Sequence, residues 1–232
     1  MILALAAALA SAQAGTADVT VCGRTMRYED QVCAALQAGK TLSFKDSAEA
    51  YERAAVHSVP NGPNQARAYA AAGNMWIAAG EPGKAALALD RALAGTGLQA
   101  EQRGEALLDR ARAAEAQDDL MTARAKVREA EQTISGDPFL WYFSAALAIR
   151  EGDAALAKTA INRALALEPN DPTVLFEAGH VAHFAGDLAG ARDYWGRASA
   201  ADPNGKSGAA ARQALKLLDA PAAVQTQTGA TK

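Results

Sequence analysis

The sequence has few aromatic residues, few cysteines, little excess charge and no long apolar stretch after its first residues. Aromatic side chains make up 6% of the 232 residues, although hydrophobic residues, alanine above all, make up 50%. This composition is typical of closely packed helices with small side chains. The formal net charge of −3 argues against a nucleic acid as the main ligand, because neutralising phosphates requires a basic surface.

The usual signatures of catalytic and metal sites are also missing. There is no Gly-x-Ser-x-Gly, no His-Glu-x₂-His and no Gly-x-Gly-x₂-Gly after a strand. The run Gly39–Thr41 resembles the end of a phosphate-binding loop, but Ala34 stands where that loop requires glycine. His180 and His183 lie three residues apart, yet two histidines alone make an incomplete metal site. We therefore expect a non-catalytic protein without a metal or cofactor.

A repeat of 34 residues is the most regular feature of the chain. Residues 138–171 and 172–205 each contain two apolar stripes at helical spacing, separated by the pairs Gly152-Asp153 and Gly186-Asp187. The glycine can end one helix with a positive φ, and the aspartate can cap the next. Each copy closes at a proline, which stops its second helix. Since one such hairpin cannot bury both of its faces, the pattern predicts stacked hairpins.

These units resemble tetratricopeptide repeats, whose pattern is Trp-x₂-Leu-Gly-x₂-Tyr, then Ala-x₃-Phe and a closing proline. Matching residues in the last copy are Gly179, Ala191, Trp195 and Pro203. Small residues such as Gly179 and Ala145 would let the two helices of a hairpin approach closely. Residues 66–99 form a strong earlier copy, residues 104–137 form a weaker one, and residues 100–103 are extra between them. The resemblance implies an all-α, right-handed α-solenoid of about four tetratricopeptide-like hairpins with capping helices at both ends.

Both ends of the chain depart from the repeat pattern. Residues 15–64 are expected to form an N-terminal cap with a degenerate repeat, whose first helix is Tyr28–Leu36 and which ends at the break Pro60–Asn64. Residues 206–218 carry apolar side chains on one helical face and predict a C-terminal capping helix. Residues 219–232 are small and polar, and they predict a disordered tail.

The first residues are similar to a secretory signal. Residues 1–14 contain an apolar run that is too short to span a bilayer, followed by Ala12-Gln13-Ala14, the small-x-small pattern that a signal peptidase recognises. No lysine or arginine precedes the run, so the alternative is an alanine-rich helix start on a cytoplasmic protein. A cleaved signal predicts a periplasmic or secreted protein of the bacterial envelope. No other segment is apolar enough to predict a transmembrane span.

The two cysteines of the chain, Cys22 and Cys33, both precede the repeats. In an oxidising compartment their pairing would close a short loop and contribute roughly 3 kcal/mol by the loop-entropy model. The alternative is two free thiols, which is the better interpretation if the protein is not exported. A Cys/His zinc pattern is absent, so a metal role for these cysteines has little support.

In a tetratricopeptide array, the first helix of each hairpin lines a concave surface that offers a groove for a peptide or a helix. Phasing on the buried stripe of Trp141 selects these candidate partner-binding residues: Asn74, Arg112, Phe139, Tyr142, Phe176, His180 and His183. Aromatic and arginine side chains are common anchors of binding faces. For Phe139, Tyr142 and Phe176 the alternative role is packing against the adjacent repeat.

These residues predict a non-catalytic module that binds a segment of a protein partner. A clamp for an acidic C-terminal tail, as in chaperone-binding members of the family, is not expected. Ala70 breaks that clamp, and Glu105 and Glu115 make the same face acidic. The alternative function is an assembly scaffold, which associates with itself or with an envelope complex through its caps or its convex face.

Overall fold

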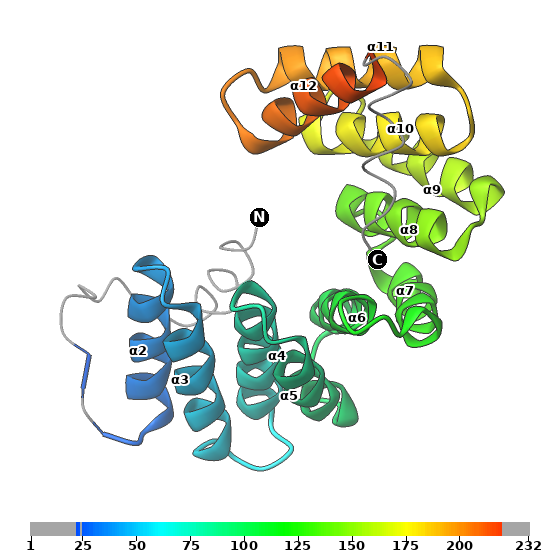
Figure 1. The fold of residues 1–232 in the computed structure, drawn as a ribbon. Coiled ribbons are helices and arrows are strands. Elements are labelled where there is room, and N and C mark those ends of the chain that lie inside the picture. The colour runs from blue at the N-terminus through cyan, green and yellow to red at the C-terminus, as the bar shows by residue number, and fades with distance from the viewer. Residues whose placement is uncertain (1–21, 24, 220–232) are drawn as a thin grey trace. The chain divides into compact units, whose positions relative to one another are not determined.

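The structure is a computed structural model that describes residues 22–23 and 25–219. These residues form α-helices and no strand. The helices pair as α2 (Tyr28–Lys40) with α3 (Phe44–Val56), α4 (Pro63–Ala78) with α5 (Pro82–Ala94), α6 (Ala100–Glu115) with α7 (Leu120–Ile134), α8 (Pro138–Glu151) with α9 (Ala154–Leu167), and α10 (Pro172–Phe184) with α11 (Leu188–Ala201); α12 (Lys206–Leu218) follows (Figure 1). The predicted signal at residues 1–14 and the predicted tail from residue 220 onward lie outside the described residues.

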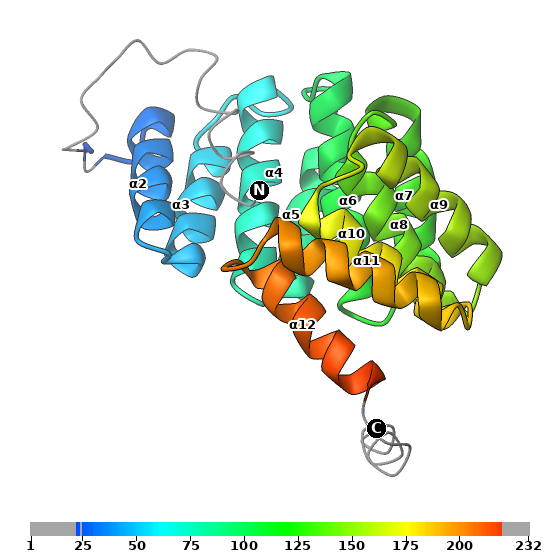
Figure 2. The ribbon, with the colours of Figure 1, turned by 90° about the horizontal axis from the view of Figure 1, so that it is seen from above.

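The helices divide into two compact units, residues 1–134 and 135–232, here called the N-terminal and the C-terminal unit. In the N-terminal unit, consecutive helices from α2 to α7 pack against one another, and α4 also lies beside α6 (Figures 1 and 2). In the C-terminal unit, α8, α10 and α12 lie side by side, and α9 and α11 pack on them. First helices of successive hairpins therefore contact each other in both units, as α4 does with α6 and α8 does with α10.

The turn inside each hairpin has the same backbone geometry. Gly80, Gly152 and Gly186 end their first helices with φ values of 74°, 77° and 80°, in the left-handed region that glycine adopts without strain. In the weaker repeat, Asp118 holds this place with φ 63°. A non-glycine residue in this region costs roughly 1 kcal/mol. This cost is small enough for the weaker repeat to keep the hairpin geometry without its glycine.

Side-chain size is matched where the two helices of a hairpin meet. A Cβ atom added to Gly73 would lie 2.4 Å from Leu89 Cγ, and one added to Gly179 would lie 2.3 Å from Trp195 Cδ1. In the two middle repeats the glycine position holds a buried alanine, and its counterpart on the second helix is the β-branched Val127 or Ile161. Each hairpin thus fills its interior with a different small and large pair.

The N-terminal cap is a complete helical hairpin. Its first helix extends past the predicted Leu36 to Lys40, and Ser47 Oγ of α3 donates a hydrogen bond to the Ala35 carbonyl of α2 over 2.8 Å. Trp76 Nε1 of α4 donates to Glu52 Oε1 of α3 over 3.1 Å, which ties the cap to the next hairpin. Helix α4 begins at Pro63, inside the predicted break, because proline is well suited to the first helical position.

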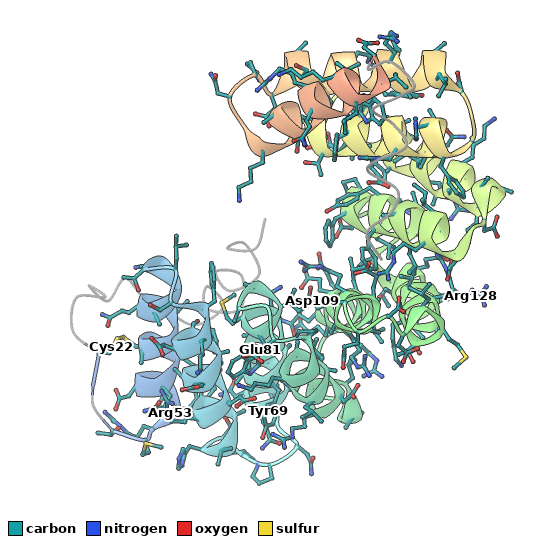
Figure 3. The ribbon with its side chains drawn as sticks, viewed as in Figure 1. Cys22, Arg53, Tyr69, Glu81, Asp109 and Arg128 are labelled. Carbon is teal, nitrogen blue, oxygen red and sulfur yellow. A yellow bond between two sulfur atoms is a disulfide. The ribbon has the colours of Figure 1, made fainter. Side chains whose placement is uncertain are left out.

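Cys22 and Cys33 form a disulfide, with their Cα atoms 5.6 Å apart (Figure 3). The bond joins the segment before α2 to the middle of that helix. None of the described helices combines the length and the apolar character required to cross a bilayer.

Candidate partner-binding faces

The structure brings Asn74 of α4 and Arg112 of α6 together around a buried carboxylate. Asn74 Nδ2 donates to Asp109 Oδ2 over 2.7 Å, and Arg112 Nη1 donates to Asp109 Oδ1 over 2.8 Å. Asp109, labelled in Figure 3, is 5% exposed and Asn74 is 6% exposed. The pKa of the Asp109 carboxyl is raised by burial, and the Arg112 charge and the hydrogen bonds from Asn74 and Arg112 offset only part of this rise. Both predicted groove residues therefore have an internal role in this unit.

Other side chains at the same helical phase of the N-terminal unit are also engaged internally. Ala70 and Leu108 are buried. Arg67 Nη2 donates to Asn64 Oδ1 over 2.6 Å on its own helix. Little of the predicted face on α4 is thus left to contact a partner.

The C-terminal unit presents aromatic rings at the predicted positions. On α8, Phe139 contacts Tyr142 edge-on with ring centroids 4.8 Å apart, and it stacks on Phe143 at 6.5 Å. All three rings are partly exposed. Helix α8 lies beside α10. The aromatic residues of the two helices therefore come from adjacent first helices of the C-terminal unit.

A second aromatic group joins α10 to α11. The His180 ring meets Phe176 at 4.5 Å and Trp195 at 5.4 Å, both edge-on, and His183 lies 5.8 Å from Trp195. Trp195 Nε1 donates to the Phe176 carbonyl over 3.1 Å, which fixes the indole beneath the rings. Burial and the neighbouring His183 lower the pKa of His180, so the neutral ring is favoured. Phe176 and His180 are partly buried and His183 is exposed.

Sequence reasoning missed Glu177, which stands between Phe176 and His180. Its side chain is partly buried, and burial raises its pKa to about 7. Among the described residues it has neither a hydrogen bond nor an ion pair. Glu177 and Asp109 occupy the same position of the repeat. Aligning the repeats position by position would have identified both acidic residues from the sequence.

Comparisons with known proteins extend this description. No family model matches the sequence, and none of the curated proteins matches it. Solved structures do match. PilW, described as a widely conserved type IV pilus biogenesis factor, has a TM-score of 0.66 at 14% identity, over 79% of this chain and 81% of PilW. MamA has a TM-score of 0.61 at 15% identity, over 76% of this chain and 92% of MamA.

A third match, YrrB, is described as a TPR protein with an unusual peptide-binding site. It has a TM-score of 0.58 at 14% identity, over 82% of this chain and 94% of YrrB. At these identities the matches define the fold. The chain therefore has a tetratricopeptide-type fold, an all-α solenoid of helical hairpins, as its 34-residue period predicts.

Proposed function

We propose that this protein is a non-catalytic interaction module whose C-terminal unit binds a peptide or helical segment of a partner protein across α8 and α10. The observation that carries this proposal is the set of partly exposed rings on these two adjacent helices: Phe139, Tyr142, Phe143, Phe176 and His180. Aromatic side chains offer a large apolar area at a low cost in conformational entropy, which suits them to anchor a binding segment. The tetratricopeptide-type fold supports an interaction role, and YrrB, which shares it, is described as having a peptide-binding site.

The contrast with the N-terminal unit supports the choice of face. There, Asn74 and Arg112 both bond to Asp109, so using either in binding would break a buried hydrogen bond. The rings of α8 and α10 are partly buried in their own unit and partly exposed. Covering their exposed part would bury further apolar surface.

We place the binding event in an extracytoplasmic compartment of the bacterial envelope. The Cys22–Cys33 disulfide supports this location, because disulfides persist in oxidising compartments. A second support is the signal-like sequence at residues 1–14, which predicts that the mature chain begins at Gly15. Cell fractionation and the intact mass of the purified chain test both points.

An assembly scaffold is the second candidate function. The observation in its favour is the exposure of large apolar side chains on second helices, at Leu87 of α5 (63% exposed), Met121 of α7 (83%) and Leu188 of α11 (52%). Association through these outer helices would leave α8 and α10 uncovered. The two candidates therefore predict contacts from different helices.

Site-specific photo-crosslinking in the native host separates these functions. A photoreactive residue replaces Tyr142 in one strain and Met121 in a matched control strain. Binding across α8 and α10 predicts a foreign protein captured from position 142 and not from position 121, and loss of that product when Phe176→Ala is added. Capture from position 121 alone, or of a second copy of the chain alone, would overturn the proposal in favour of the scaffold.

A further inference from the structure

The internal repeat allows one acidic position to be compared between the units. Asp109, Phe143 and Glu177 follow one another at intervals of 34 residues, so they occupy the same place on α6, α8 and α10. On α6 this place points toward the preceding first helix, since Asp109 accepts a hydrogen bond from Asn74 of α4. It also accepts from Arg112, one turn further along its own helix. The carboxylate of the N-terminal unit thus has two donors.

Glu177 lacks both donors. The residue of α8 that corresponds to Asn74 is Ala146, which has no polar side chain. The residue of α10 that corresponds to Arg112 is His180, whose ring packs edge-on against Phe176 and Trp195 instead. Glu177 is therefore a partly buried carboxylate that no described residue bonds.

A carboxylate that is partly withdrawn from water and has no donor is costly, and a cation that reaches it removes part of this cost. We propose that Glu177 receives a basic side chain, arginine in preference to lysine, from the partner segment bound across α8 and α10. This inference rests on the function proposed above and specifies the chemistry of the partner. The basic residue would supply from outside the donors that Asn74 and Arg112 supply to Asp109.

The surroundings of Glu177 suit such a side chain. The partly exposed ring of Phe176 lies on the same helix, and aromatic faces attract both the aliphatic stem and the planar head of an arginine. The planar guanidinium can donate two parallel hydrogen bonds to one carboxylate, whereas lysine offers a single point charge. A metal ion fits this place less well, because no group of three potential metal ligands occurs in the described part of the chain.

A defined peptide library tests the inference with the full-length chain. Phage-displayed random dodecapeptides are selected on the wild-type protein and depleted on the double variant Tyr142→Ala/Phe176→Ala. The retained peptides are synthesised, and their dissociation constants are measured for the wild type, Glu177→Gln and the control Glu168→Gln. Glu168 is an exposed acid at the end of α9, so the control makes the same charge change away from α8 and α10.

The retained peptides are expected to carry an arginine or lysine beside apolar residues. Glu177→Gln should weaken their binding about tenfold, and Glu168→Gln should change it less than about twofold. Replacing the peptide arginine with neutral citrulline should reproduce the loss on the wild type and cause little change on Glu177→Gln. This last measurement requires no change in the protein and is therefore independent of its folding.

Two results would overturn the inference in distinguishable ways. Peptides that require Tyr142 and Phe176 but are acidic or purely apolar, or that bind Glu177→Gln as tightly as the wild type, would reject the role of Glu177 and leave the proposed function intact. If depletion on the Tyr142→Ala/Phe176→Ala variant leaves no peptide that binds the wild type, both the inference and the proposed function fail.

Discussion

The two units place acidic side chains at one repeat position and surround them differently. In the N-terminal unit, Asp109 is buried between two donors, Asn74 and Arg112. In the C-terminal unit, the corresponding residues are Ala146, which has no donor, and His180, whose ring packs against Phe176 and Trp195. Glu177 therefore lacks both donors. A buried carboxylate with a donor on each oxygen helps to fix how two hairpins stack, whereas one without donors costs stability until something binds it. The N-terminal unit thus uses this position for its own cohesion, whereas we propose that the C-terminal unit uses it for recognition.

The largest predicted effect is the loss of the Asp109 carboxylate. Asp109→Ala leaves the Arg112 charge and the Asn74 amide without their acceptor, and it should lower the free energy of unfolding of the N-terminal unit by about 3 kcal/mol. Hydrogen exchange read by mass spectrometry locates the effect, because peptides of α4 and α6 should lose protection while those of α10 should not. The equivalent change in the other unit, Glu177→Ala, is the control and should not destabilise the protein. If both variants lose the same stability, the two positions do not differ as proposed.

The second prediction concerns Gly179, which packs against the Trp195 indole. Gly179→Ala would put a methyl group 2.3 Å from Trp195, whose indole is held by its bond to the Phe176 carbonyl. We expect a loss of about 2 kcal/mol in thermal or urea unfolding of the C-terminal unit, because relief requires the indole to move. Displacing Trp195 should also disturb Phe176 and weaken peptide binding.

Gly196→Ala is the matched control for this change. Gly196 lies on α11, and an added Cβ there would have no neighbour within 4 Å. Since alanine favours the helix over glycine, this variant should gain about 0.5–1 kcal/mol. Equal effects of the two substitutions would show that the packing against Trp195 is looser than its geometry indicates.

The repeat period predicts much of this fold, because it follows from residues that act locally. Gly152 and Gly186 end helices, prolines close the copies, and the apolar stripes set the buried faces. Two features did not follow from the period. Helix α4 begins at Pro63, where a local break was expected, and the weaker repeat keeps its turn with Asp118 in the left-handed conformation.

The candidate site was less predictable, because it depends on contacts between hairpins. The helical phase selected Asn74 and Arg112 as residues of an open surface, but it could not show that Asp109 bonds to both. The same phase passed over Glu177 because that residue stands one position beside the predicted groove. Aligning the repeats by position, rather than by apolar pattern alone, shows Asp109 and Glu177 as a pair. The binding roles of Phe139, Tyr142 and Phe176 stay predictions.

The smallest predicted effect is a pH dependence of stability that belongs to Glu177. Its pKa is about 7 in the folded protein, against an ordinary value of 4.5, so between these pH values the folded state binds more protons than the unfolded state. Stability should therefore fall as pH rises from 4.5 to 7 and level off above, by about 1 kcal/mol after allowing for partial exposure. Glu177→Gln removes this dependence. The difference between the wild type and the variant, measured by urea unfolding from pH 5 to pH 8, cancels the opposite contribution of His180, whose pKa is lowered. A difference that does not change with pH would mean that the carboxylate is already solvated or bonded, and its contrast with Asp109 would disappear.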